Sequence, residues 1–327
     1  MVNKDIVEDD KPLRKHHKYI NPATDFGFKR IFKDEEITRG FLNELVKTQD
    51  PTIDIAKVTI TDGECDESNQ DIRRVVYDVH CETDTGEEFV IEMQNSEQIF
   101  FAERIVYYLS RAASRQQDKG TIDYIDEDGK VKKRDWDYHL KKIYGVFFMN
   151  FIDPKHDDRL AHFAFMETTK KYKDSDVFQY WKIQMPLYRR MKESDCKTNI
   201  DKWMYNLSNL DVMDTQLSFT EEIPLFMRLG QIASYSNLNK KQQIVYDDSY
   251  NNYLAYHGSM EYKLREGIRI GEEKGRAEGL AEGEKKGRAE GAKQKAISIA
   301  RAMKQHGDAI DYIALITGLT PSEITSL

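Results

Sequence analysis

The segment VVYDVHCETDTGEEFVIEMQN, residues 75–95, holds the side chains best suited to chemistry. Apolar and polar residues alternate in both of its halves, a pattern that predicts two half-buried β-strands. Asp78 lies on the polar face of the first strand, and Glu92 and Gln94 lie on the polar face of the second. Carboxylates are the oxygen ligands that Mg²⁺ prefers. Strands that bring Asp78 and Glu92 together would therefore form a metal site.

The turn between the two strands decides whether these carboxylates meet. A shift of one residue in the pairing turns every apolar side chain of a strand to the opposite face. The apolar residues of both strands have odd numbers, so both apolar faces are buried together only if the numbers of paired residues sum to an even number. This condition excludes a two-residue turn and favours the three-residue loop Asp84–Gly86, whose glycine takes the left-handed conformation. Thr83 then pairs with Glu87, and Asp78 lies opposite Glu92.

Like charges that face each other across a strand pair are destabilising by a few tenths of a kcal/mol to about 1 kcal/mol. We therefore expect a cation near Asp78 and Glu92. A divalent metal, Mg²⁺ or Mn²⁺, would polarise a substrate phosphate and make a bound water more acidic, which is the chemistry of phosphodiester hydrolysis. His80 shares this face and is either a phosphate donor or only a neighbour. The alternative to a metal site is a solvated outer face, formed by Asp78, Glu82, Glu88 and Glu92.

The elements around the hairpin follow the order α-β-β-β-α-β and predict an α/β fold. Apolar residues at helical spacing, with a cap at Thr24 or Asp25, predict two short helices between residues 24 and 48. Strands are expected at residues 55–61, 72–82 and 88–94, a helix at 100–117, a strand pair around 126–129 and a strand at 143–151. Accessory strands (160–166 and 177–187) and helices follow up to residue 260.

This order of elements and motifs resembles the PD-(D/E)XK nuclease superfamily, which has a restriction-endonuclease-like core. Residues 18–295 carry the resemblance, which is closest to the branch of recombination-promoting nucleases and transposases. The matching motifs are TDFGFKRIF at 24–32, FLNEL at 41–45, IEMQ at 91–94 and ERIVYYLSRAASRQQDKG at 103–120. The resemblance implies an endonuclease that depends on Mg²⁺ or Mn²⁺ and cuts DNA.

The resemblance also implies roles for individual residues. Asp78 and Glu92 would hold the metal, with the backbone carbonyl of Met93 as a further ligand. Gln94 occupies the position of the superfamily's lysine, and an amide can orient a water or a phosphate but supplies no charge and takes no proton. Lys29 could replace that lysine from another part of the chain; its alternative is a surface lysine on a capped helix.

Four further residues could reach the metal or the nucleic acid. Glu44 could bind the metal from the first helical region, or occupy a solvated helix position. Arg104, Arg111 and Arg115 lie on similar sides of the helix after the hairpin, where a nucleic-acid backbone would pass. Ion pairing on the helix surface is the alternative for these arginines.

By composition the chain divides into a polar tail (residues 1–18), a nuclease domain (19–260), a glycine-repeat arm (261–295) and a small helical tail (296–327). Glycine recurs at every fourth position from Gly267 to Gly291. Each glycine in a helix costs about 1 kcal/mol of stability relative to alanine. A helical repeat therefore needs other interactions to compensate this loss of stability. Close packing against a second copy, in a homodimer, would supply them; the alternative is a charged, partly helical linker. Gly307 and Gly318 are expected to end helices in the tail.

The 327 residues include 49 Lys and Arg against 57 Asp and Glu, a formal net charge of -8. This balance excludes a basic protein that coats nucleic acid, so DNA contact requires a local patch. No segment has the apolar length of a membrane span, and the three cysteines lack metal-ligand spacing. We expect a cytoplasmic protein without membrane contact. The alternative to catalysis is a weak or inactive module, built on the nuclease fold, that binds nucleic acid or another partner.

Overall fold

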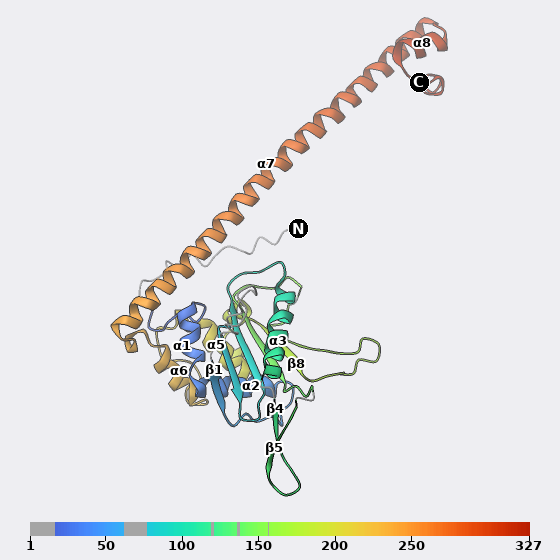
Figure 1. Ribbon diagram of the computed structural model, residues 1–327. Coiled ribbons are helices and arrows are strands. Elements are labelled where there is room, and N and C mark those ends of the chain that lie inside the picture. The colour runs from blue at the N-terminus through green and yellow to red at the C-terminus, as the bar shows by residue number, and fades with distance from the viewer. Residues whose placement is uncertain (1–16, 62–76, 119–120, 136–137, 156) are drawn as a thin grey trace. The chain divides into compact units, whose positions relative to one another are not determined.

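The computed structural model describes residues 17–61, 77–118, 121–135, 138–155 and 157–327. Its internal contacts divide the chain into two compact units, residues 1–253 and 254–327. The first unit is a mixed α/β structure built on a six-stranded sheet (Figure 1). The predicted polar tail lies almost entirely outside the described residues.

The central sheet contains β1 (Val58–Thr61), β2 (Val79–Thr83), β3 (Glu88–Gln94), β6 (Ile143–Met149), β7 (Leu160–Ala164) and β8 (Phe178–Gln184). The strand order across the sheet is β1-β2-β3-β6-β8-β7. The first three strands form an antiparallel meander, β6 and β8 continue it in parallel with β3, and β7 pairs antiparallel with β8. The predicted order of three strands, a helix and a further strand is confirmed.

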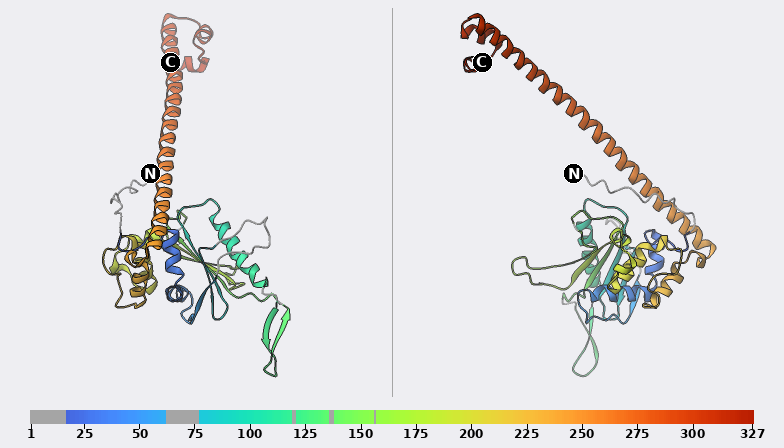
Figure 2. Two further views of the ribbon diagram at one scale, coloured as in Figure 1. Left: turned by 60° about the vertical axis from the view of Figure 1, so that its left-hand side comes forward. Right: turned by 180° about the vertical axis from the view of Figure 1, so that it is seen from behind.

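Helices cover both faces of the sheet (Figures 1 and 2). Because neighbouring residues of a strand point to opposite faces, the two hydrophobic cores can be told apart along β6. Val146 and Phe148 belong to the first core, which is covered by α1 (Asp25–Phe32), α2 (Glu35–Lys47), α5 (Asn199–Asn209) and α6 (Leu225–Ala233). Phe147 and Met149 belong to the second core, which is covered by α3 (Phe101–Asp118).

The two predicted helices at the start of the first unit are α1 and α2. Thr24 caps α1, since its hydroxyl oxygen accepts a hydrogen bond from the Gly27 amide at 3.0 Å. Asp34 caps α2 in the same way through the Ile37 amide, at 3.1 Å. The apolar residues that predicted these helices are buried in the first core: Phe28, Ile31, Phe32, Phe41, Leu42 and Leu45.

Some elements differ from the predicted ones. The strand expected over residues 177–187 ends at Gln184, because Pro186 lies in the first turn of a short helix, α4 (Met185–Arg189). The strand expected over residues 72–82 is described only from residue 77, and residues 72–76 lie outside the described residues. The predicted pair around residues 126–129 forms a separate two-stranded sheet, β4 (Thr121–Ile125) and β5 (Val131–Asp135). Three single turns of 3₁₀-helix complete the unit: η1 (Glu193–Asp195), η2 (Leu210–Val212) and η3 (Tyr235–Asn237).

The C-terminal elements are α7 (Lys240–His306), α8 (Ile310–Thr317) and α9 (Pro321–Thr325). The glycine repeat lies inside α7, and a Cβ atom built on any of its glycines would meet nothing within 4 Å. Gly307 and Gly318 end α7 and α8 with φ angles of 94° and 70°, as predicted. A small core joins these elements, formed by Ala300, Ile313, Leu319 and Ile324. Within the described part of the chain, no helix has the length and apolarity needed to span a membrane.

Candidate active site

The hairpin of β2 and β3 has the predicted register. Val79 pairs with Ile91, so the numbers of paired residues sum to 170. The Thr83 amide donates to the Glu87 carbonyl at 2.9 Å and closes a three-residue loop. The last residue of this loop, Gly86, has a φ of 88°. The loop length, the closing pair and the left-handed glycine are therefore confirmed.

Asp78 and Glu92, called here the carboxylate pair, face each other at the open end of this hairpin. The Asp78 amide donates to Glu92 Oε1 at 3.0 Å. The Met93 amide donates to Asp78 Oδ2 at 2.8 Å. The Glu92 side chain is only 2% exposed, and Asp78 is half-buried. Each carboxylate is thus held by a backbone amide of the opposite strand.

Burial and proximity change the protonation of the pair. Burial, followed by the charge of Asp78, raises the pKa of Glu92 to about 8. Burial also raises the pKa of Asp78, although the hydrogen bond from the Met93 amide acts in the opposite direction. The pair therefore retains a proton at neutral pH in the absence of a bound cation. A divalent cation would have to displace this proton.

The part of the polar face that holds Glu88 and Glu92 lies beneath α3 and is buried. Glu88 and Glu92 are both buried. His80 is buried on the same face; its Nε2 lies 3.0 Å from Glu88 Oε2, and its ring stacks against Tyr77. The alternative of a solvated outer face is therefore wrong for Glu88 and Glu92. Because His80 is paired with Glu88, it is not directed at the carboxylate pair.

Lys29 on α1 is a positive charge within electrostatic reach of the pair. Its Nζ lies 2.6 Å from Asp25 Oδ1, one turn earlier in the helix. Burial acts to lower the pKa of Lys29, but the hydrogen bond and charge of Asp25 and the charges of the carboxylate pair outweigh it, so this pKa is raised. Asp25 was not among the predicted site residues; its charge adds to burial in raising the pKa of Asp78. The four-residue spacing of Asp25 and Lys29 on one helix was the available signal.

Gln94 and Arg104 complete the polar group around Glu92. Gln94 Nε2 donates to Glu92 Oε2 at 3.4 Å. Arg104 Nη1 donates to Gln94 Oε1 at 3.4 Å, and Arg104 Nη2 lies 3.9 Å from Glu92 Oε2. The hydroxyl oxygen of Tyr108 accepts from Arg104 Nη2 at 2.6 Å and holds the guanidinium in place. Arg104 from α3 and Lys29 from α1 are thus the positive side chains that act on the carboxylate pair.

A comparison with protein-family models matches residues 22–262 to the PD-(D/E)XK nuclease family transposases. The matched range contains the hairpin, α1 and α3, and hence all of the residues that surround the carboxylate pair. The chain belongs to this family. The resemblance inferred from the motifs is confirmed. Neither the curated proteins nor the solved structures contain a match to the chain.

PD-(D/E)XK nucleases generally use divalent metal ions, and the carboxylate pair fits such an ion. It offers hard oxygen ligands. Its two acidic groups lie so close that the charge of Asp78 helps to raise the pKa of Glu92. Among the described residues no group of three or more His, Cys, Asp or Glu side chains forms a complete metal cage. The pair would therefore need water, substrate or a backbone carbonyl such as that of Met93 to complete the coordination of a metal.

The remaining predicted residues of this PD-(D/E)XK family member do not contact the carboxylate pair. The Arg115 guanidinium lies over the Tyr77 ring, 4.9 Å from its centre. Arg111 Nε and Arg115 Nε and Nη2 are buried, and no described residue accepts a hydrogen bond from them. Glu44 is half-buried on α2 and makes no hydrogen bond or ion pair with either carboxylate. The structure therefore groups Gln94, Lys29 and Arg104 around Asp78 and Glu92, and leaves out Glu44, Arg111 and Arg115.

Proposed function

We propose that this member of the PD-(D/E)XK nuclease family is a DNA endonuclease that depends on Mg²⁺ or Mn²⁺. The observation that carries the proposal is the carboxylate pair, in which a buried Glu92 and a half-buried Asp78 are each held by a backbone amide of the opposite strand. Such a pair is costly to the fold unless a cation neutralises it. The family match to nuclease transposases supports a nucleic-acid substrate.

Each residue of the site has a proposed role. Asp78 and Glu92 would hold the metal, with the Met93 carbonyl as a further ligand. When bound, the metal would polarise the phosphate and make its water more acidic. Gln94 orients water or phosphate through its amide. Lys29 supplies the fixed positive charge that Gln94 lacks and stabilises negative charge that develops on the phosphate.

The proposed partner is DNA, and the proposed assembly is a homodimer. Arg104, Arg111 and Arg115 lie along α3, which starts next to the carboxylate pair. We propose that these arginines contact the DNA backbone, and that the glycine repeat of α7 joins two copies. A cytoplasmic location is also proposed, because Cys81 and Cys196 are free thiols; Cys65 lies outside the described residues.

Plasmid nicking by the purified protein tests the proposal. Asp78→Asn and Glu92→Gln should each reduce Mg²⁺- or Mn²⁺-dependent nicking by more than the roughly 10- to 100-fold that the loss of an outer-shell partner costs. Both variants should also weaken Mn²⁺ binding in calorimetry. Glu88→Gln is the matched control, since Glu88 is a buried glutamate on the same strand but is paired with His80. Nicking that persists in both site variants would show that the metal assignment is wrong.

The second candidate function is a nucleic-acid-binding module with weak or no activity. The observation that favours it is Gln94, which stands at the position of the superfamily's lysine. A wild-type protein that binds DNA and Mn²⁺ but does not nick plasmid with either metal would support this function instead.

A further inference from the structure

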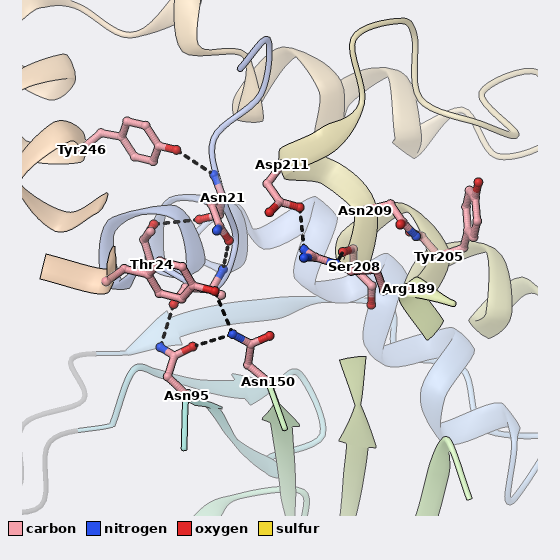
Figure 3. A network of polar contacts seen from close by, with 12 residues as sticks. Asn21, Thr24, Asn95, Asn150, Arg189, Tyr205, Ser208, Asn209, Asp211 and Tyr246 are labelled. Atoms are coloured by element: carbon pink, nitrogen blue, oxygen red, sulfur yellow. Dashed lines mark hydrogen bonds and ion pairs between the residues drawn. The ribbon is translucent and has the colours of Figure 1, made fainter. Parts of the chain in front are cut away.

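A network of side-chain amides links the end of the site strand to the start of α1 (Figure 3). Asn95 directly follows Gln94 at the end of β3. Its Nδ2 donates to the Ala23 carbonyl at 2.8 Å. Ala23 is buried and lies two residues before Asp25, the first residue of α1. One hydrogen bond thus joins the strand that carries Glu92 to the helix that carries Lys29.

The orientation of the Asn95 amide is fixed by Asn150, which follows β6. Asn150 Nδ2 donates to Asn95 Oδ1 at 3.3 Å and to the Tyr253 hydroxyl at 3.0 Å. The Asn150 backbone amide donates to the Gln94 carbonyl at 2.8 Å. Because the carbonyl oxygen of Asn95 accepts from Asn150, its NH₂ group must face Ala23. Figure 3 shows both asparagines directed at the turn that precedes α1.

Residues of α7 hold the other side of the same turn. The Tyr246 hydroxyl accepts from the Asn21 amide at 3.0 Å, and Ser249 Oγ accepts from the Phe26 amide at 3.2 Å. Asn21 Oδ1 in turn accepts from the Ala23 amide at 2.8 Å. The start of α1 is therefore held between strand ends and α7 by neutral hydrogen bonds.

We propose that Asn95 is a positioning residue: through Ala23 it fixes α1 so that the charges of Lys29 and Asp25 stay within electrostatic reach of the carboxylate pair. It acts through Lys29 and does not touch substrate or metal. The expected effect on the rate of nicking rests on the proposed nuclease function. The anchoring of α1 can be measured whether or not the protein is a nuclease. Lys29 lies on the second turn of a short helix, so a shift of the first turn moves its charge relative to the pair.

The test combines kinetics with amide hydrogen exchange. Asn95→Ala should lower the kcat of plasmid nicking by about 10- to 100-fold, the size of effect expected from a displacement of about 1 Å, and leave KM within about twofold. In a protein that already carries Lys29→Met, the same change should cost less than about twofold, since Asn95 then has no charge to position. Amide exchange should become faster in a peptide covering residues 17–32. Asn95→Ser serves the same test if the alanine variant does not fold.

Asn43→Ala is the matched control. Asn43 on α2 also ties a helix to a separate backbone segment, 12 residues further on, since its side-chain amide bonds both the Ile55 amide at 2.8 Å and the Ile55 carbonyl at 2.9 Å. Its loss should destabilise the protein and speed exchange around residue 55, with kcat within about twofold of wild type.

Two results would overturn the positioning role. One is an unchanged kcat in the Asn95 variants while exchange in residues 17–32 becomes faster; the other is an equal loss in the presence and absence of Lys29. A wild-type protein that does not nick at all would count against the proposed function, and unchanged exchange in the Asn95 variants would separately count against the anchoring.

Discussion

Glu92 is the residue whose chemistry depends most on its surroundings. Arg104 and Lys29 both act to lower its pKa, yet burial and the charge of Asp78 outweigh them. The two cations therefore compensate the carboxylate pair only in part. The uncompensated charge is what a divalent metal would neutralise, and in metal-free protein it should appear as a pH-dependent loss of stability.

The direction of this pH dependence follows from the raised pKa of Glu92. Its pKa is about 8 in the folded protein against an ordinary value of 4.5, so the folded state binds the proton more tightly. Stability then falls as the pH rises from about 5 to beyond 8, because only the unfolded state gains from ionisation in that range. Glu92→Gln removes this titration. In metal-free buffer we expect the variant to exceed wild type in unfolding free energy by at least about 1 kcal/mol at pH 8.5, with a smaller gain at pH 5.5.

Urea unfolding at the two pH values measures this difference. Glu88→Gln provides the comparison, because Glu88 is a buried glutamate of the same strand whose carboxylate bonds His80. Added Mg²⁺ should stabilise wild type at pH 8.5 and have little effect on Glu92→Gln. A gain that is the same at both pH values would contradict the assignment of the raised pKa to Glu92.

At the scale of elements, the position of α1 depends on a glycine. A Cβ atom at Gly27 would lie 2.1 Å from the Asn21 backbone oxygen and 2.7 Å from Thr24 Oγ1. Neither the carbonyl nor the capping hydroxyl can move away without breaking the cap of α1. The glycine of the TDFGF motif is therefore required by the turn that carries Lys29.

Gly27→Ala should lower the unfolding free energy by about 1 to 3 kcal/mol, the usual cost of overpacking, as measured by urea unfolding. Gly230→Ala on α6 is the control, since a Cβ atom there would meet its nearest neighbours at 3.8 Å, an ordinary contact. Because alanine is the better helix former, this control should be neutral or more stable by up to about 1 kcal/mol. Equal effects of the two substitutions would show that the close approach to Asn21 is relieved at little cost.

Elements governed by local rules could be predicted from the sequence. The parity of the hairpin fixed the loop Asp84–Gly86 and the pairing of β2 with β3. The helix cap at Thr24 could likewise be predicted, because capping needs only a hydroxyl and a nearby amide. The end of β8 was missed although Pro186 was visible, because the apolar pattern continues past it into α4.

The sequence predicted the grouping of those site residues that lie on one hairpin, and not the rest of the site. Asp78, Glu92 and Gln94 share adjacent strands, so alternation alone places them together. Asp25 and Asn95 become part of the site only when α1 meets the end of β3, and no local pattern encodes that contact. The sequence analysis also missed that α3 packs over this polar face. The polarity of His80 and Glu88 indicated exposure to solvent, but the two side chains bond each other and are buried.

At the scale of the whole molecule, residues 254–327 form a unit with its own small core. Large apolar side chains remain exposed on this unit, including Tyr312, Leu315 and Ile316. Such a surface in so small a unit favours association with a second copy. We expect the full chain to be a homodimer, in keeping with the proposed role of the glycine repeat.

Deleting residues 261–327 should leave a monomer, because the first unit retains its sheet and both cores. Sedimentation velocity measures the change in mass, and the ratio of nicked to linear plasmid measures its consequence. The truncated protein should nick one strand but seldom linearise the plasmid, since two active sites are needed to cut both strands together. A full-length protein that sediments as a monomer at micromolar concentration would favour the linker function of the repeat.

The open space around the repeat glycines has a consequence for how this helix can change over generations. Apart from the helix's own backbone, no atom of the described residues lies within 4 Å of the positions where their side chains would begin. Gain or loss of one four-residue unit would therefore disturb no packing within the chain, while it changes the length of α7 by about 6 Å and its rotational phase by about 40°. Slippage in the DNA that encodes a repeated peptide, such as RAEG at 276–279 and 288–291, would supply such changes. Descendants of one gene should accordingly differ in the number of units and keep the carboxylate hairpin intact.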